Sequence, residues 1–287
     1  MTPVCIVTDS STRFPTPSIL NRYPITLAPI KVRCGAVSVQ DETETDLARM
    51  QDIAESCKSY SKIEVPSMGD MIDIYSQLQS GADQILSIHT SSGLSEMVNN
   101  ANAASQHFLG RVDIQVIDSQ SASIGLGWLV QAAAEAAARG EPLETIVRIV
   151  RGMIPRLYLV FFLDDLTYLE HNGLISRSQA ILGNMLGVIP FLTMEEGRMI
   201  PMEKVRSRPR AIEKLIEFVC EFSAVENLAI LQSYKRPTQE SLSVMDRLRS
   251  YHPRSPIQTV CYGPSLSTFI GFNSLGVAVM EAEEGTL

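Results

Sequence analysis

The residues best suited to bind a ligand follow the apolar run 85–88. A histidine and a threonine come first, and Ser91, Ser92 and Ser95 come after them. Apolar residues spaced three and four apart begin at Leu94 and predict a helix there. Hydroxyl groups beside the free N–H groups of a helix N-terminus can hold a carboxylate or a phosphate. Serine and threonine are also the ordinary N-cap residues, so this stretch alone favours helix capping.

Similar polar corners follow two other apolar runs. Asp9 and Ser10 come after the run 4–7, and the polar segment 118–121 comes after 112–117. If these runs are parallel strands of one sheet, their carboxyl ends lie at the same edge, where α/β sheets bind ligands. Taken together, the three corners make a ligand site as good an interpretation as capping.

Known catalytic signatures are missing from the sequence. It contains no G-x-S-x-G, no P-loop and no G-x-G-x-x-G. His89 lies two positions before Ser91 on one strand end, which favours a hydrogen-bonded strand residue over a catalytic base. The acid pairs 164–165 and 195–196 suit a helix start and a turn. We therefore predict a binding protein and not an enzyme.

Composition narrows the class of protein. The chain has 287 residues, 45% of them hydrophobic, and a net charge of −8 without a basic stripe, which argues against a nucleic-acid partner. No apolar run reaches membrane-spanning length and no signal peptide is recognisable, so we expect a cytoplasmic protein without membrane insertion. Five scattered cysteines and four separated histidines predict no disulfide, no metal site and no cofactor.

Strands and helices alternate in the first half of the chain. This alternation predicts a three-layer α/β domain with a parallel sheet over residues 1–155. A capping box, Ser67 to Asp70, opens one of its helices. Strands are expected at 4–7, 25–32, 85–88 and 112–117, and helices at 43–58, after 67, from 94, at 125–139 and at 143–154.

The pattern changes near Pro155. The segment 195–197 fits a hairpin turn between two strands. Residues 156–287 are predicted to form a second α/β domain with a mixed sheet. Strands are expected at 157–162, 188–194, 199–204, 228–231 and 257–261, and helices at 164–173, 175–187, 209–222 and 239–251.

Short motifs along essentially the whole chain resemble the DegV family of bacterial lipid-binding proteins. The resemblance implies two α/β domains that hold a long-chain fatty acid or similar lipid in an apolar tunnel between them. It also implies that some members present this fatty acid to a separate kinase. The motifs are Val7-Thr8-Asp9-Ser10, Pro66-Ser67, Ser91-Ser92-Gly93-Leu94-Ser95, Asp118-Ser119 with Gly125, Asp164-Asp165-Leu166 with Leu169 and Gly173, Gly197 with Ile200-Pro201 and Lys204-Val205-Arg206, and Gly263-Pro264 with Leu275-Gly276.

The resemblance assigns the lipid head group to Ser92, flanked by Ser91 and Ser95. Three further positions of the expected site have lost a polar side chain, and each lost hydrogen bond to a buried carboxylate costs about 1–3 kcal/mol. Weaker binding or a less polar ligand therefore stays open. The three positions are Ile63 where the family has threonine, Leu174 where it has arginine and Phe269 where it has histidine.

A basic cluster lies between Lys204 and Lys214 in an otherwise acidic chain. Arg206 within it matches the family and is a candidate for a partner surface, although a solvated helix start is the slightly better interpretation of the cluster. Two functions remain. The first is a lipid carrier, and the second is an enzyme or kinase component, either the lipid-presenting subunit of a fatty acid kinase or a distant relative acting on a small hydroxylated or phosphorylated substrate.

Overall fold

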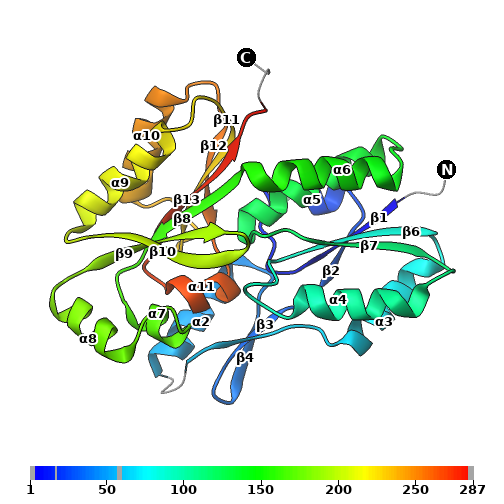
Figure 1. Cartoon of the computed structure of the whole chain (residues 1–287), viewed down its shortest axis with the longest axis horizontal. Helices are drawn as coiled ribbons and strands as arrows, with labels where there is room; N and C mark the ends of the chain where they lie inside the picture. The colour runs from blue at the N-terminus through cyan, green and yellow to red at the C-terminus, as the bar shows by residue number, and fades with distance from the viewer. Residues whose placement is uncertain (1–3, 17, 57–59, 284–287) are drawn as a thin grey trace.

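Four parallel strands form the sheet of the N-terminal lobe in the computed structural model, which describes residues 4–16, 18–56 and 60–283 (Figure 1). These are β1 (Val4–Asp9), β2 (Ile25–Ala28), β6 (Gln84–His89) and β7 (Asp113–Asp118). Their order is β2-β1-β6-β7, and every neighbouring pair is parallel, as predicted. Strand β6 is buried along nearly its whole length, which is typical of a parallel strand covered on both faces.

Helices cover both faces of this sheet and complete the three predicted layers. On one face, Val7 and Ile85 pack with two helices, the first of which opens with the predicted capping box. On the other face, Ile6 and Leu86 pack with two more. The first pair is α3 (Met68–Gln79) and α4 (Met97–Ser105), and the second is α5 (Ser123–Ala138) and α6 (Leu143–Met153).

A small antiparallel sheet corrects the prediction of one strand over 25–32. That segment divides at Pro29, which has no N–H group to donate to a ladder. Cys34 is disulfide-bonded, contrary to the expectation of no disulfide, because spacing along the chain does not report which thiols meet in the fold. The end of the predicted helix 43–58 lies outside the described residues. The sheet has the order β4-β3-β5, with β3 (Lys31–Cys34), β4 (Val37–Gln40) and β5 (Lys62–Glu64), and α2 (Glu44–Ser56) lies beside it.

The C-terminal lobe contains a six-stranded mixed sheet, as predicted. Its strands are β8 (Leu157–Phe162), β9 (Ile189–Glu195), β10 (Arg198–Val205), β11 (Val225–Gln232), β12 (Ile257–Cys261) and β13 (Leu275–Glu281), in the order β10-β9-β8-β13-β11-β12. Strand β13, in the middle of the sheet, was not predicted. It pairs antiparallel with both β8 and β11, so it joins the two halves of the sheet.

Helices on this second sheet differ between its two faces. Val160 and Phe162 point to a core formed with α9 (Arg208–Cys220) and α10 (Gln239–Tyr251). Leu159 and Phe161 point to the opposite face, toward α5 of the N-terminal lobe. The remaining helices are α1 (Ile19–Arg22), α7 (Thr167–His171), α8 (Arg177–Met185) and α11 (Pro264–Ile270), with short 3₁₀ turns at Gln106–Phe108 and Ile154–Arg156.

Helix α5 lies between the two sheets and joins the lobes. It contacts β1 and β6 on one side and β8 and β13 on the other. We call the apolar cluster around it the shared core, because its buried residues come from both lobes, for example Ile88, Leu129, Leu159 and Met280. In the described ranges no helix combines the length and the apolar character that crossing a bilayer requires. The boundary at 155/156 stays a prediction, since the two halves share one interior.

Gly127 shows how closely α5 approaches the loop after β1. A Cβ added to Gly127 would lie 1.8 Å from the carbonyl oxygen of Arg13, a backbone atom that cannot rotate away. We expect Gly127→Ala to destabilise the protein, because overpacking costs about 1–3 kcal/mol and outweighs the roughly 1 kcal/mol that alanine gains in a helix. The measurement is the free energy of unfolding in urea. Gly152→Ala on α6 is the matched control: a Cβ there meets nothing within 4 Å, so this variant should be more stable. Equal effects of the two changes would contradict the packing argument.

Candidate functional site

The three polar corners predicted from the sequence meet at the carboxyl edge of the parallel sheet. The Asp9 carboxylate accepts hydrogen bonds from the backbone N–H of Thr90 (2.8 Å) and from its hydroxyl (3.1 Å). The Ser11 hydroxyl lies 2.9 Å from that of Thr90, and Ser119 N–H donates to the carbonyl of His89 at 3.1 Å. The ends of β1, β6 and β7 therefore form one hydrogen-bonded unit, which we call the polar edge.

Asp9 is the buried charge at the centre of the polar edge. Its side chain is fully buried, and it faces Nδ1 of the equally buried His89 at 3.4 Å. Burial raises the pKa of Asp9, but His89, the Ser11 hydroxyl and the Thr90 N–H together outweigh burial and hold this pKa below its ordinary value. The other ring nitrogen of His89 lies 2.7 Å from the Ser87 hydroxyl, which accepts a hydrogen bond from Tyr75. His89 is thus a hydrogen-bonded strand residue, as predicted.

The predicted head-group serines form a turn and not the first turn of α4. Ser91 accepts hydrogen bonds from the N–H groups of Leu94 and Ser95 through its carbonyl, and α4 begins only at Met97. The prediction that the helix begins at Leu94 was therefore wrong by one turn. The Ser95 hydroxyl accepts a long hydrogen bond from Met97 N–H at 3.4 Å.

The hydroxyl donors of Ser91 and Ser92 are already occupied. Ser91 is buried and donates to the carbonyl of Gly197, at the β9–β10 turn of the other lobe, at 2.6 Å. Ser92 is exposed, and both its hydroxyl and its N–H point to the carboxylate of Asp118. Asp118 thus holds the position that a ligand carboxylate would take at Ser92.

The three positions where the family resemblance implies a polar side chain pack in apolar surroundings. Ile63 pairs with Val32 across β5 and β3 and packs on the core of the small sheet. Leu174 and Phe269 are partly buried against the shared core. Arg206 is exposed, directly after β10. All of these side chains stay predictions as ligand or partner contacts.

The sequence did not predict a buried ion pair of the N-terminal lobe that also bonds to the C-terminal lobe through one of its oxygens. Arg13 pairs with Asp41, and its other guanidinium nitrogen donates to the carbonyls of Ser10 (3.1 Å) and Thr12 (3.2 Å). The second oxygen of Asp41 accepts from the N–H of Ser265 in α11 at 2.8 Å. Nothing in the local sequence marks these residues as partners, because they lie on three distant segments.

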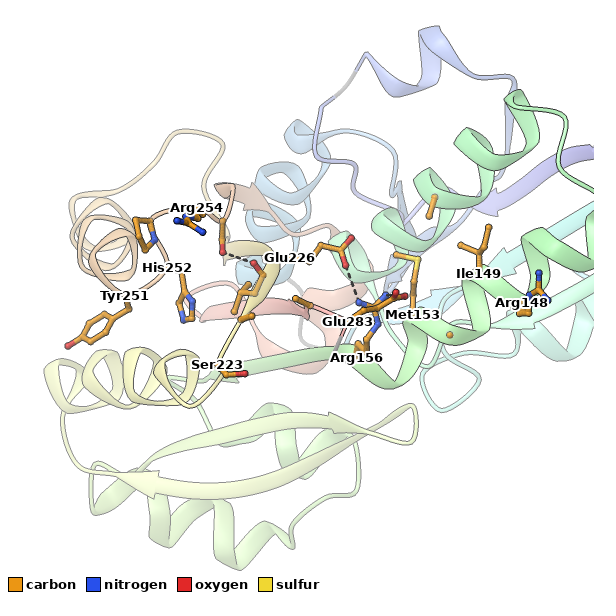
Figure 2. A pocket seen from close by; sticks show the side chains of 17 residues that line it. Arg148, Ile149, Met153, Arg156, Ser223, Glu226, Tyr251, His252, Arg254 and Glu283 are labelled. Atoms are coloured by element: carbon orange, nitrogen blue, oxygen red, sulfur yellow. Dashed lines mark hydrogen bonds and ion pairs between the residues drawn. The ribbon is translucent and has the colours of Figure 1, made fainter. Parts of the chain in front are cut away.

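A large open cavity lies away from the polar edge, where β8 and β11 begin and β13 ends. Its volume is about 880 Å³, and Figure 2 shows Arg148 of α6 and Arg254 at opposite sides of it. Arg156 in its floor is paired with Glu226 and Glu283. None of the residues predicted to hold the ligand lines this cavity.

The fold and the polar edge together define a two-lobed α/β protein in which a hydroxyl-lined sheet edge adjoins an apolar interior. The chain belongs to the DegV family, whose model, described as an uncharacterised protein family, matches residues 3–282. It is 25% identical to protein DegV of Bacillus subtilis over 277 residues, which cover 96% of this chain and 98% of that protein.

Two solved structures share the fold. The first is a fatty-acid-binding DegV family protein from Thermus thermophilus, with a TM-score of 0.82 and 25% identity over 98% of this chain and all of that one. The second is the fatty acid kinase B3 protein of Streptococcus pneumoniae loaded with linoleic acid. It has a TM-score of 0.83 and 19% identity over 98% of this chain and all of that one. The predicted family and fold are confirmed.

Proposed function

We propose that this protein binds a long-chain fatty acid or similar lipid without chemically altering it. The acyl chain would occupy the shared core, and the head group would lie at the polar edge. The observation that carries the proposal is the continuity of the two features. Leu159 and Leu129 of the shared core lie on the same elements, β8 and α5, that approach the serines at the end of β7.

Two considerations support an acyl chain in this place. The shared core brings together side chains from two lobes, so a ligand can enter by separating them without unfolding either sheet. Burying an alkyl chain there gains about 0.8 kcal/mol per methylene group, which makes a long chain the favoured occupant. The solved relative from Thermus thermophilus is described as fatty-acid-binding, in keeping with this proposal.

Lipid binding is tested on protein from which organic solvent has removed bound lipid. After incubation with a mixture of saturated and unsaturated long-chain acids, native mass spectrometry should show one acyl chain per protein. A short-chain acid of the same charge is the control and should leave no adduct, because most of the binding energy comes from the chain. Protein that carries no acyl chain under any of these conditions would refute the proposal.

Presentation of the lipid to a fatty acid kinase is the second candidate. The exposed position of Arg206 after the edge strand β10 favours it, because a cation there is free to meet an acidic partner. Formation of an acyl phosphate in a mixture with the kinase subunit of the source organism distinguishes this role from storage or transport. Lipid binding without such turnover supports the carrier.

A further inference from the structure

The large open cavity between α6 and the C-terminal lobe is lined by residues of both lobes. Arg148, Ile149 and Met153 of α6 lie on one side of it, as Figure 2 shows. Ser223 and Arg254 of the C-terminal lobe lie toward the other side (Figure 2). The volume of about 880 Å³ falls in the range of small-molecule sites, roughly 300–1,000 Å³. A molecule bound here would therefore contact both lobes at a place distinct from the polar edge.

Two arginines of this cavity form no ion pair with any of the described residues. Arg148 is exposed on α6, and Arg254 is exposed after the end of α10. A third arginine, Arg156, is neutralised by Glu226 and Glu283. Three arginines and two glutamates leave the cavity net positive in a chain whose net charge is −8. The cavity therefore attracts anions, in contrast to the acidic protein as a whole.

The floor between the two free arginines also offers a hydrogen-bond acceptor. Glu226 pairs with Arg156 through Oε2 at 3.0 Å, and its side chain is still 47% exposed. Its other oxygen, Oε1, can therefore accept a hydrogen bond from a hydroxyl group of a ligand. An alkyl chain would instead leave the charged groups of the floor without water or a partner, which is unfavourable.

The two sides of the cavity suit different chemical groups. Arg148 lies beside the apolar side chains of Ile149 and Met153, and a guanidinium group next to an apolar wall can stack on a planar ring. Arg254 shares its side of the cavity with the hydroxyl of Ser223. A guanidinium group and a hydroxyl together suit a phosphate, which arginine binds through two parallel hydrogen bonds.

We infer that this cavity binds a nucleoside diphosphate, with the diphosphate at Arg254 and Ser223 and the base against Arg148. The ribose then lies over the floor, where Glu226 accepts from its hydroxyls, as acidic residues do in dinucleotide sites. A single inorganic phosphate would engage only one of the two free arginines. The site is independent of the proposed lipid binding, because none of the residues at the polar edge lines the cavity.

Isothermal titration calorimetry of the full chain with ADP tests this site. We expect Arg254→Ala to weaken ADP binding about tenfold to a hundredfold, because hydrogen bonds to a charged phosphate are lost. Arg148→Ala should weaken it about threefold to tenfold, because stacking contributes less. Arg151→Ala is the matched control. Arg151 is an exposed arginine of the same helix that does not line this cavity, so its loss should change ADP affinity less than about twofold.

Two fragments of ADP test whether both ends of the ligand are recognised. Adenosine and pyrophosphate should each bind at least about tenfold more weakly than ADP, since each engages one side of the cavity only. Pyrophosphate that binds as tightly as ADP would overturn the inference. Wild-type protein that does not bind ADP, or ADP affinity that either cavity variant leaves unchanged, would overturn it as well.

Failure of this site and failure of the proposed function are distinguishable in the same preparations. The three substituted arginines are exposed and unpaired among the described residues, so the variants should fold, and urea unfolding verifies this. Native mass spectrometry with long-chain acids measures lipid binding separately. ADP binding without any acyl chain would refute the proposed function alone, and an acyl chain without ADP binding would refute the nucleotide site alone.

Discussion

Replacing Asp41 with alanine should lower the free energy of unfolding by about 3–5 kcal/mol, because it leaves the Arg13 guanidinium buried without its counterion. Asp41 is completely buried, and Arg13 is 8% exposed at its side chain. The change also removes the acceptor of the Ser265 N–H in α11. Urea unfolding monitored by circular dichroism measures the loss of unfolding free energy. Most of this loss should come from the Arg13 charge, which stays buried without its counterion.

Two further variants isolate the contribution of charge. Arg13→Met/Asp41→Ala removes the stranded cation as well and should recover part of the loss, since a buried pair costs less to delete whole than to break. Asp246→Ala breaks the exposed pair with Arg249 and is the matched control, with an expected change below about 1 kcal/mol. If Asp41→Ala is no more costly than this control, the buried pair does not stabilise the folded protein.

The pair also shows why part of the fold could not be predicted. Two elements with a strong local signal were predicted to the residue: β8 is an apolar run bounded by breaks, and α10 begins after a threonine cap. Strand β13 was missed, although its residues are apolar. Its place between β8 and β11 depends on pairing with strands far away in the sequence, which local periodicity does not report.

The candidate site, like the fold, could be predicted from the sequence only in part. The convergence of the polar corners could be predicted, because parallel strands end at one edge whatever their exact pairing. Whether each hydroxyl has a hydrogen-bond partner could not be predicted. Ser92 and Ser121 are both serines that follow a strand, yet one is bonded to Asp118 and the other is unpaired. Whether a hydroxyl finds a partner depends on which acceptors other segments of the chain place nearby. The local sequence of either corner does not contain that information.

Asp9→Asn should also cost about 3–5 kcal/mol of unfolding free energy near neutral pH. The carboxylate accepts from the Ser11 hydroxyl (2.5 Å) and from both donors of Thr90, and it faces His89. An amide presents an NH₂ group to one of these donors, so a buried charge-assisted network loses an acceptor. The same loss should loosen the start of the 91–95 turn, because the Asp9 carboxylate is the acceptor of the Thr90 N–H.

The pH dependence of stability distinguishes the effect of the Asp9 charge from the effect of the shape of its side chain. The folded-state pKa of Asp9 lies below its ordinary value of 3.8, so ionised Asp9 stabilises the protein above that value. As the pH falls past 3.8 and through the lowered pKa, this contribution disappears. Wild-type stability should therefore decline in this acidic range, and Asp9→Asn, which has no carboxylate to protonate, should decline less steeply. Asp73→Asn on the exposed side of α3 is the control and should follow the wild-type curve. An acidic decline that Asp9→Asn shares in full would show that the network at the polar edge does not depend on the Asp9 charge.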